Sequence, residues 1–473
     1  MKFFKSILSD NSKFKSIDND IIRKYNKTRN SKSKKYLCYA PFKSLTFFIG
    51  GDIMVCWHNK QYLLGHYPED SIKEIWFGKK AEIFRKHIIN NDLSLGCAEC
   101  LRHIETNNYN LASTWRYDYL SGWSSKYPVT MDFQISNICN LECIMCNGEF
   151  SISVRQHREM ENPYINPYDS NFINQLDLFI PHLKEANFSG GEAFLINQYF
   201  EIWEKIYNIN PSVKISVTSN STVLNDRIKK ILEKLRFNFT ISIDSVNKET
   251  YEKIRKNASF EETFYNFDYY LEYTKRKKTF FSVRICPLRQ NWKEIPEIIN
   301  FLNKKDVESY FNTVIFPPYS SLWNLKSDEI NEIVNYLSGF RFENNTKNQK
   351  QNNQNYENLI KQLKDWYKEA ILREIEYPFI ETFETEKLKN ILFTKVFEYI
   401  NNSKSFKPEE QKRFNLFFEL AINTCQNEIK DIEQYKLALC YYISLPINRL
   451  VDEFNIRSLE KIINFTKQAG RTF

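Results

Sequence analysis

Hydrophobic residues in the middle of the chain follow two spacings in turn. Runs in which every second residue is apolar predict strands at residues 129–135, 185–188, 213–218, 239–244, 282–284 and 310–316. Between these runs, helical spacing predicts helices at 198–208, 226–237, 248–278 with breaks, and 293–305. Alternating strands and helices predict a parallel α/β sheet with right-handed crossovers, six strands between about Val129 and Tyr319.

After Tyr319 the pattern contains helices alone. Residues 344–355 read Asn-Asn-Thr-Lys-Asn-Gln-Lys-Gln-Asn-Asn-Gln-Asn, a polar run of low complexity that predicts a solvated loop or linker. Residues 356–375, 384–402, 409–424 and 428–443 then predict amphipathic helices. This C-terminal all-helical region could bind a peptide, a carrier or another subunit, and the sequence does not choose among them.

Composition narrows the class of protein. A chain of 473 residues has the length for two or three domains with a sizeable core. It has no apolar run of about 18 residues, and its start, MKFFKSILSD, lacks a small-residue cleavage site, so we expect a cytoplasmic protein without a membrane span. The net charge of +8 is modest for this length, which argues against a nucleic-acid partner.

Three cysteines carry the most specific signal. Cys139, Cys143 and Cys146 follow the first predicted strand in the order C-N-L-E-C-I-M-C. A cubane iron–sulfur cluster takes four ligands, so three thiolates leave one iron open to a substrate or cosubstrate. A zinc knuckle would want a fourth ligand nearby, and the next histidines, His157 and His182, lie outside that spacing.

Three further motifs follow the cysteine loop in a fixed order. Ser189-Gly190-Gly191-Glu192 ends the second predicted strand, Ser219-Asn220-Ser221-Thr222 ends the third, and the fourth reads F-T-I-S-I-D with Ser242 inside it. Together with the cysteine loop, this order resembles the radical S-adenosylmethionine (radical SAM) superfamily. A Gly-Gly-Glu sequence alone is a common turn, and the order of the motifs gives it weight.

The resemblance implies a partial (β/α)6 barrel with its active site at the carboxyl ends of the strands. The open iron would chelate the amino and carboxyl groups of S-adenosylmethionine and donate the electron that yields a 5'-deoxyadenosyl radical. It also implies roles for single residues: Gly190, Gly191 and Glu192 cradle the methionine and its ammonium group, Asn220 lies beneath the ribose, and Ser242 lies near the cosubstrate.

The chain departs from the family pattern at some positions. Ala193 replaces a frequent proline, and Met145 replaces the aromatic residue that leans on the adenine. Met145 is either an adenine contact or a gap filler. Arg255 and Arg284 could each meet a carboxylate, or could lie on a solvated helix face and strand edge.

A second set of cysteines precedes the predicted barrel. Cys38, Cys56, Cys97 and Cys100 are a complete set of four thiols, and the surrounding sequence is similar to part of the SPASM or Twitch modules that hold auxiliary iron–sulfur clusters. The resemblance implies one auxiliary 4Fe-4S cluster without an open iron, placed ahead of the barrel. Zinc is the alternative metal for such a set of thiols, and disulfides are disfavoured in a reducing cytosol.

These observations predict four parts: a polar N-terminal segment (1–35), a SPASM/Twitch-like module (36–125), a radical SAM core (126–325) and a helical C-terminal region (326–473). The resemblance implies hydrogen abstraction from a peptide or protein, with a sugar or small metabolite as the alternative substrate. It implies S-adenosylmethionine and an electron donor such as flavodoxin or ferredoxin as partners. The alternatives to an enzyme are a degenerate iron–sulfur protein and a zinc-binding protein.

Overall fold

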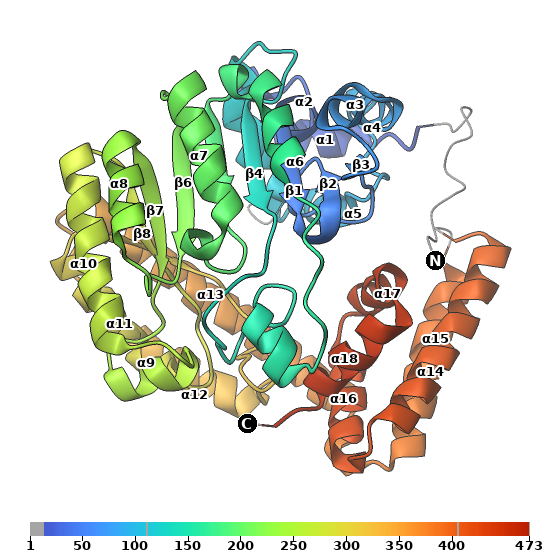
Figure 1. Ribbon diagram of the computed structural model, residues 1–473. Helices are drawn as coiled ribbons and strands as arrows, with labels where there is room; N and C mark the ends of the chain where they lie inside the picture. The colour runs from blue at the N-terminus through green and yellow to red at the C-terminus, as the bar shows by residue number, and fades with distance from the viewer. Residues whose placement is uncertain (1–13, 110–111, 404–405, 473) are drawn as a thin grey trace.

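The computed structural model describes residues 14–109, 112–403 and 406–472, and a single mixed sheet forms its centre (Figure 1). Six of its strands are the predicted ones: β4 (Thr130–Gln134), β5 (Glu185–Phe188), β6 (Lys214–Ser219), β7 (Phe237–Ser242), β8 (Phe281–Ile285) and β9 (Glu308–Phe311). All neighbours from β4 to β9 pair in parallel, in chain order. The predicted parallel α/β core is therefore confirmed.

The two faces of this sheet differ in polarity. Along β7, buried Phe237, Phe239 and Ile241 alternate with partly exposed polar residues. The apolar face packs on the helices that connect the strands, as where the ring centroid of Phe239 lies 4.7 Å from that of Tyr270. These helices are α7 (Asn197–Ile209), α8 (Asp226–Lys234), α9 (Lys248–Ile254), α10 (Phe260–Lys277) and α11 (Ile295–Lys304). The other face is polar and partly open to solvent, as expected for the inside of a partial barrel.

The N-terminal part of the chain extends the same sheet. Strand β1 (Ser44–Phe48) pairs in parallel with β4, and β2 (Asp52–Met54) and β3 (Gly65–His66) continue the sheet as antiparallel strands. Its helices are α1 (Asn19–Lys27), α2 (Ala40–Lys43), α3 (Ile72–Phe77), α4 (Lys79–Ile89) and α5 (Ala98–Glu105). Part of the predicted polar segment, residues 1–13, lies outside the described residues.

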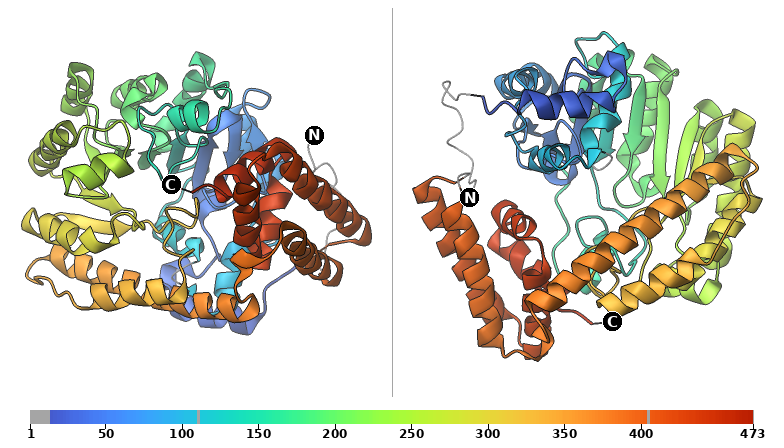
Figure 2. Two further views of the ribbon diagram at one scale, coloured as in Figure 1. Left: turned by 90° about the horizontal axis from the view of Figure 1, so that it is seen from below. Right: turned by 180° about the vertical axis from the view of Figure 1, so that it is seen from behind.

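The prediction of a solvated loop at residues 344–355 was wrong. These residues begin α13 (Lys347–Glu376), a helix that lies beside β9 and α12 (Ser327–Ser338) (Figure 2). The Asn352 Oδ1 atom accepts a hydrogen bond from the Ser309 backbone nitrogen at 2.7 Å, and the Asn355 amide donates to the Ser309 carbonyl at 2.7 Å. Asparagine side chains of the polar run therefore form hydrogen bonds with backbone groups at the free edge of the last strand, and this explains why asparagine occurs in a helix there.

The last strand and the C-terminal helices also differ from expectation in detail. Strand β9 ends at Phe311, before the predicted end at Phe316. The helices α14 (Thr385–Asn402), α15 (Pro408–Glu428) and α16 (Ile432–Ser444) were predicted, and α17 (Ile447–Ile456) and α18 (Leu459–Ala469) were not. The Phe316 and Phe465 rings stack at 4.4 Å and join α18 to the core. In the described part of the chain, no helix is long and apolar enough to span a bilayer.

Candidate functional site

The cysteine loop begins directly beyond the carboxyl end of β4. Cys139, Cys143 and Cys146 lie close enough for the charge of one thiolate to act on another. Burial first, and then the neighbouring Cys143, raise the pKa of the Cys139 thiol to about 12. Burial, and then the charges of Cys143 and Cys139, also raise the pKa of Cys146. Three thiols from one loop, with Cys143 buried and Cys139 and Cys146 partly buried, are a ligand set that a cationic metal centre would stabilise.

The two glycines after β5 pack against this loop. Gly190 has a φ of +104°, and a Cβ atom on Gly191 would lie 1.9 Å from the carbonyl oxygen of Ile138. The Gly191 nitrogen donates to the Ser136 carbonyl at 3.1 Å, and the Glu192 nitrogen donates to the Ile138 carbonyl at 2.6 Å. This motif therefore lies so close to the start of the cysteine loop that glycine is required.

Glu192 connects the carboxyl ends of β5 and β6. Its side chain is fully buried, and its carboxylate accepts hydrogen bonds from the Ser219 hydroxyl at 2.9 Å and from the Asn220 nitrogen at 2.7 Å. Burial raises the pKa of Glu192, and these hydrogen bonds act against that rise. The Asn220 amide in turn donates to Asn140 at 3.1 Å and lies 3.8 Å from the Cys139 sulfur. Glu192 and Asn220 thus come together beside the first cysteine.

A buried ion pair lies beside the second cysteine. The Arg255 guanidinium lies 2.6 Å from the Asp244 carboxylate, and its Nη1 atom lies 3.9 Å from the Cys143 sulfur. Burial alone would lower the pKa of Arg255, but the negative charges of Asp244 and Cys143 raise it above the ordinary value. Of the two interpretations of Arg255, the solvated helix face is excluded, since the residue is 5% exposed.

The remaining predicted residues lie at the same edge of the sheet. Ser242 is the last residue of β7 and pairs in register with Arg284 of β8. Met145 is half-buried and packs against an apolar group that includes Ile144, Ile254 and Leu288. Glu192, Asn220 and Ser242 thus follow or end a strand, where a parallel barrel places its active site. Arg255 reaches Cys143 from the end of α9.

The four N-terminal cysteines also come together. Burial first, then the charges of Cys56 and Cys100, raise the pKa of Cys38, and the Cys97 thiol is affected by all three others. Neighbouring backbone groups act against this rise in pKa at three of the thiols: Ala40 at Cys38, His58 and Asn59 at Cys56, and Ser113 and Thr114 at Cys100. The Asn59 amide lies 3.4 Å from the Cys97 sulfur. Hydrogen bonds of this kind stabilise thiolates and tune an iron–sulfur cluster.

Both sets consist of thiol groups, the ligand type of iron–sulfur clusters. A zinc site needs four ligands about 2.0–2.3 Å from one point, whereas each thiolate of a cubane binds a different iron. Three thiols would leave one iron of a cubane without a protein ligand, and four thiols would supply a ligand to every iron.

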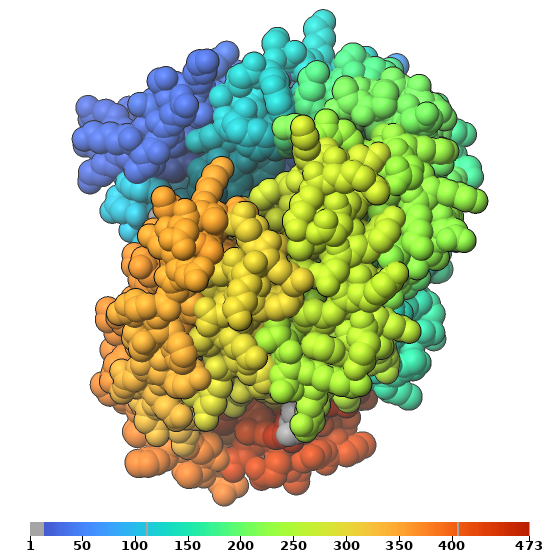
Figure 3. Space-filling view, turned by 90° about the vertical axis from the view of Figure 1, so that its left-hand side faces the viewer, coloured from blue at the N-terminus to red at the C-terminus, as the bar shows by residue number. Residues whose placement is uncertain are grey.

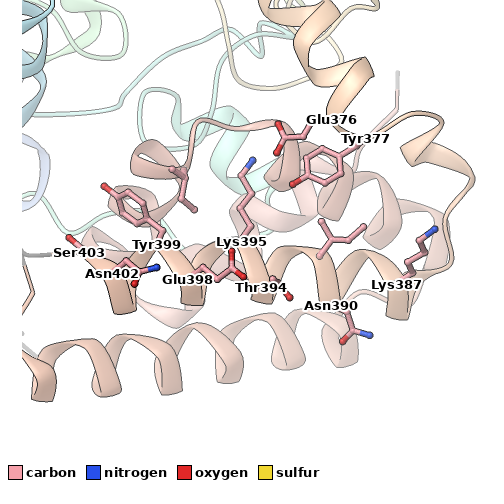
Figure 4. A pocket seen from close by; sticks show the side chains of 12 residues that line it. Glu376, Tyr377, Lys387, Asn390, Thr394, Lys395, Glu398, Tyr399, Asn402 and Ser403 are labelled. Atoms are coloured by element: carbon pink, nitrogen blue, oxygen red, sulfur yellow. The ribbon is translucent and has the colours of Figure 1, made fainter.

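A cavity among the C-terminal helices lies away from this chemistry. It is an open groove of about 970 Å³ between the end of α13, one face of α14 and the start of α17. Its lining is mixed and includes Glu376, Tyr377, Lys395 and Tyr399 (Figure 4). None of the predicted cysteine, glycine or cosubstrate residues lines it.

Sequence reasoning missed several residues around the cysteines. Arg158 donates to the carbonyls of Cys143, at 3.2 Å, and of Cys146. Glu159 accepts from the Gly148 nitrogen at 2.7 Å and from Gln468 of α18, so the last helix reaches the segment after the loop. The charged pair R-E shortly after the cysteines was the available signal for Arg158 and Glu159. Nothing in the local sequence pointed to Gln468.

Comparison with known families agrees with both cysteine sites. Residues 133–302 match the model of the radical SAM superfamily, and residues 38–101 match that of an iron–sulfur cluster-binding domain, SPASM. The first match spans β4 to α11 and contains the cysteine loop, and the second contains all four N-terminal cysteines. The cluster-binding module therefore precedes the core, as the sequence predicted.

Relatives are distant and match in part. A probable GTP 3',8-cyclase of Methanocaldococcus jannaschii is 25% identical over 197 residues, which are 40% of this chain and 59% of that protein. A GTP 3',8-cyclase of Clostridium botulinum is 19% identical over 178 residues, 38% of this chain and 50% of that protein. The chain thus spans between half and three fifths of the length of these relatives.

Two solved structures match at low scores. Native anSMEcpe with bound AdoMet is 18% identical, with a TM-score of 0.35 over 44% of this chain and 60% of that one. Streptococcus suis SuiB bound to precursor peptide SuiA is 13% identical, with a TM-score of 0.34 over 58% of this chain and 53% of that one.

Proposed function

We propose that this chain, which belongs to the radical SAM superfamily and carries a SPASM domain ahead of its core, binds S-adenosylmethionine at the cysteine loop and abstracts hydrogen from a substrate. Cys139, Cys143 and Cys146 would hold a 4Fe-4S cluster with one open iron. Such a cluster supplies the electron that cleaves S-adenosylmethionine to methionine and a 5'-deoxyadenosyl radical. The observation that carries the proposal is the meeting of the three loop cysteines with Glu192, Asn220 and Arg255 at one edge of the sheet.

The chain's own residues would bind and orient the cosubstrate. The Glu192 carboxylate joins β5 to β6 and holds Asn220 beside Cys139, with the Asn220 amide 3.8 Å from the Cys139 sulfur. Gly190, Gly191 and Glu192 would cradle the methionine, with Ser242 and Met145 as further contacts. The Arg255 guanidinium, held by Asp244, would offset the negative charge of the Cys143 thiolate.

The N-terminal cysteines would hold an auxiliary cluster. Cys38, Cys56, Cys97 and Cys100 supply four thiolates, so no iron would stay open to a substrate. Strand β1 links this module to β4, the strand that leads into the cysteine loop, through continuous parallel pairing. We therefore infer a role in electron relay or structural support.

We favour a peptide or protein as substrate over a sugar or small metabolite. The helices after β9 are more than is needed to close a barrel over a small molecule, and they carry an open groove of about 970 Å³. Helix α18 contacts the segment after the cysteine loop through the Gln468–Glu159 hydrogen bond (Figure 1). A chain held by these helices would thus lie near the proposed site of radical formation.

The test is cosubstrate cleavage. Protein purified without oxygen, reconstituted with iron and sulfide and reduced with dithionite should release 5'-deoxyadenosine or methionine from S-adenosylmethionine. The matched control is Cys425→Ala, which removes a buried thiol of α15 that belongs to neither set. No product from the reconstituted wild type, with its iron content confirmed, would exclude the proposed reaction and favour a degenerate iron–sulfur protein.

A further inference from the structure

Arg255 faces Cys143 between two backbone hydrogen bonds. Two nitrogens of the cysteine loop donate to carbonyls of the segment that ends α9: Glu142 to Lys256 at 3.1 Å, and Ile144 to Ile254 at 2.9 Å. The two bonds run antiparallel, so the residues between them, Cys143 and Arg255, lie opposite each other. The Arg255 Nη1 atom accordingly lies 3.9 Å from the Cys143 sulfur. Main-chain bonds thus align the two segments, and these bonds do not involve the arginine side chain.

A carboxylate holds the guanidinium in this position. The Arg255 guanidinium lies 2.6 Å from Asp244, and the Asp244 Oδ1 atom accepts a hydrogen bond from the Cys286 nitrogen at 2.7 Å. Both charged side chains are buried, so water screens their charges weakly. The contact with Cys143 therefore brings a weakly screened positive charge to the sulfur.

One nitrogen of this guanidinium lacks an acceptor. The Arg255 Nε atom is buried, and among the described residues it has no hydrogen-bond partner. A buried donor on a charged group is costly to leave unpaired. The thiolate and sulfide sulfurs of an iron–sulfur cluster accept hydrogen bonds and carry negative charge. The unpaired nitrogen beside Cys143 therefore fits a cluster held by the cysteine loop.

The donors that reach Cys139 are neutral, in contrast to the charged donor at Cys143. The Leu141 nitrogen lies 3.5 Å from the Cys139 sulfur, and the Asn220 amide lies 3.8 Å from it. Burial raises the pKa of the Cys143 thiol, and the positive charge of Arg255 is the largest effect that opposes this rise. The negative charge that the loop gains in a redox reaction would therefore be stabilised mainly from the side of Cys143.

Reduction of an iron–sulfur cluster changes its charge by one unit. The electron donor loses one electron and the cluster gains it, without a change in the bonds to the protein. A positive charge that bonds to a ligand sulfur stabilises the reduced state more than the oxidised state. Hydrogen bonds to the sulfurs and the net charge of the site are among the factors that set cluster potentials.

We propose that Arg255, held by Asp244, is a positioning residue that raises the reduction potential of a cluster at the cysteine loop through its contact with Cys143. This inference rests on the proposed function for the presence of that cluster. A higher potential makes it easier for an external donor to deliver the electron that cleavage of S-adenosylmethionine needs. Asp244 has the opposite effect on the potential, because its negative charge offsets part of the arginine's charge.

The test is a redox titration of the reconstituted full chain without S-adenosylmethionine, followed by electron paramagnetic resonance. The signal that is missing when Cys139, Cys143 and Cys146 are all replaced with Ala identifies the cluster of the loop. Arg255→Gln should shift its one-electron equilibrium about tenfold toward the oxidised state, a potential about 59 mV more negative. Arg255→Lys, which keeps the charge, should give a smaller shift in the same direction.

The sign of a second variant separates this effect from a disturbed fold. Asp244→Asn should shift the potential upward, because the charge of Arg255 is then unopposed. The double variant Asp244→Asn, Arg255→Gln should lie between the two single variants. A loop that is merely loosened would instead lose iron, or change its potential in the same direction in both single variants.

The control is Arg276→Gln, which should leave the potential unchanged. This arginine is exposed and paired with Glu233 at 2.7 Å, and it lies on α10, part of the yellow-green outer surface (Figure 3). An unchanged potential in Arg255→Gln with its full iron content would overturn the proposal, and so would a shift of the same sign in Asp244→Asn. Weaker binding of S-adenosylmethionine at an unchanged potential would also overturn it, because the arginine would then serve the cosubstrate.

The result is independent of the cleavage test. Opposite shifts of the potential in Arg255→Gln and Asp244→Asn, in a protein that does not cleave S-adenosylmethionine, would uphold the role of Arg255 and remove the proposed reaction. Cleavage by the wild type, together with an unchanged potential in both variants, would do the reverse.

Discussion

The two cysteine sites differ in how the chain assembles them. Cys139, Cys143 and Cys146 come from one loop after one strand, whereas Cys38, Cys56, Cys97 and Cys100 come from three separate segments of the N-terminal module. Side chains from other segments reach two cysteines of the loop: the Asn220 amide lies 3.8 Å from the Cys139 sulfur, and the Arg255 Nη1 atom lies 3.9 Å from that of Cys143. Among the N-terminal sulfurs, that of Cys97 lies 3.4 Å from the Asn59 amide.

The two sites also share a structural feature. Each has a buried arginine–aspartate pair next to one cysteine: Arg255 and Asp244 beside Cys143, and Arg29 and Asp118 near Cys38. The Asp244 side chain is fully buried, whereas that of Asp118 is 15% exposed. At both sites a buried arginine therefore acts on one cysteine, and the carboxylate that pairs with this arginine is more deeply buried at the cysteine loop.

The largest expected effect is complete loss of S-adenosylmethionine cleavage when the cysteines of the loop alone are replaced. Replacing Cys139, Cys143 and Cys146 together with Ala should abolish cleavage of S-adenosylmethionine and remove about four of about eight irons, one cubane's share. The remaining iron should stay with the N-terminal cysteines, because the two sets share no ligand. Iron analysis and product detection by chromatography check both parts. Equal cleavage by the triple variant would contradict the assignment of the cysteine loop as the site of S-adenosylmethionine cleavage.

The reciprocal variant separates the roles of the sites. Cys97→Ala with Cys100→Ala should also lose about half the iron, yet keep cleavage when dithionite supplies the electrons. The reason is that no residue of this set lies among the predicted cosubstrate contacts. Zinc in place of iron at this site, in protein prepared without oxygen, would contradict the auxiliary-cluster assignment.

The contrast between the sites also explains what the sequence could predict. The cysteine loop and its following motifs are local patterns, so they were found with the strands that carry them. The four N-terminal cysteines lie far apart in sequence, and family resemblance was needed to group them. Asn352 bonds to the edge of β9, and Gln468 contacts Glu159. Both contacts join segments that are far apart in the sequence, so no local sequence pattern could predict them.

The two arginine–aspartate pairs allow the two sites to be compared by the free energy of unfolding. Arg255→Met should lower the free energy of unfolding by about 3–5 kcal/mol, because it leaves the Asp244 carboxylate buried without its partner. Arg29→Met should cost less, since solvent reaches Asp118. Urea unfolding of both variants measures the difference. The double variant Asp244→Asn, Arg255→Met should recover part of the loss, and failure to recover any would show that Arg255 acts through Cys143 alone.

A smaller effect is expected at Glu192. Glu192→Gln should weaken binding of S-adenosylmethionine about ten- to a hundredfold, since one charge-assisted hydrogen bond is worth about 1.5–3 kcal/mol. Cluster absorbance should not change, because no cluster ligand is altered. Titration of the cosubstrate, followed by the electron paramagnetic resonance signal of the reduced cluster, gives the dissociation constant.

The control for that variant is Ser219→Ala, which removes a hydrogen-bond donor to Glu192 and leaves its charge in place. A milder loss of affinity in this control would indicate that the Glu192 charge itself meets the cosubstrate. An equal loss would indicate that Glu192 acts by positioning Asn220. No change in either variant would mean that the Gly190-Gly191-Glu192 motif is a turn.

The smallest effect concerns backbone strain at the end of β6. Ser221 is buried with a φ of +63°, whereas Gly50, Gly51 and Gly96 of the N-terminal module adopt such angles as glycines. Ser221→Gly should be more stable than Ser221→Ala by about 1 kcal/mol, because both lose the hydroxyl and the alanine keeps a left-handed conformation that a Cβ atom disfavours. The midpoints of urea unfolding measure this difference. Equal stabilities would show that Ser221 carries no strain, and that the Asn266 amide, which donates to its carbonyl at 2.9 Å, is enough to hold the strand end that positions Asn220.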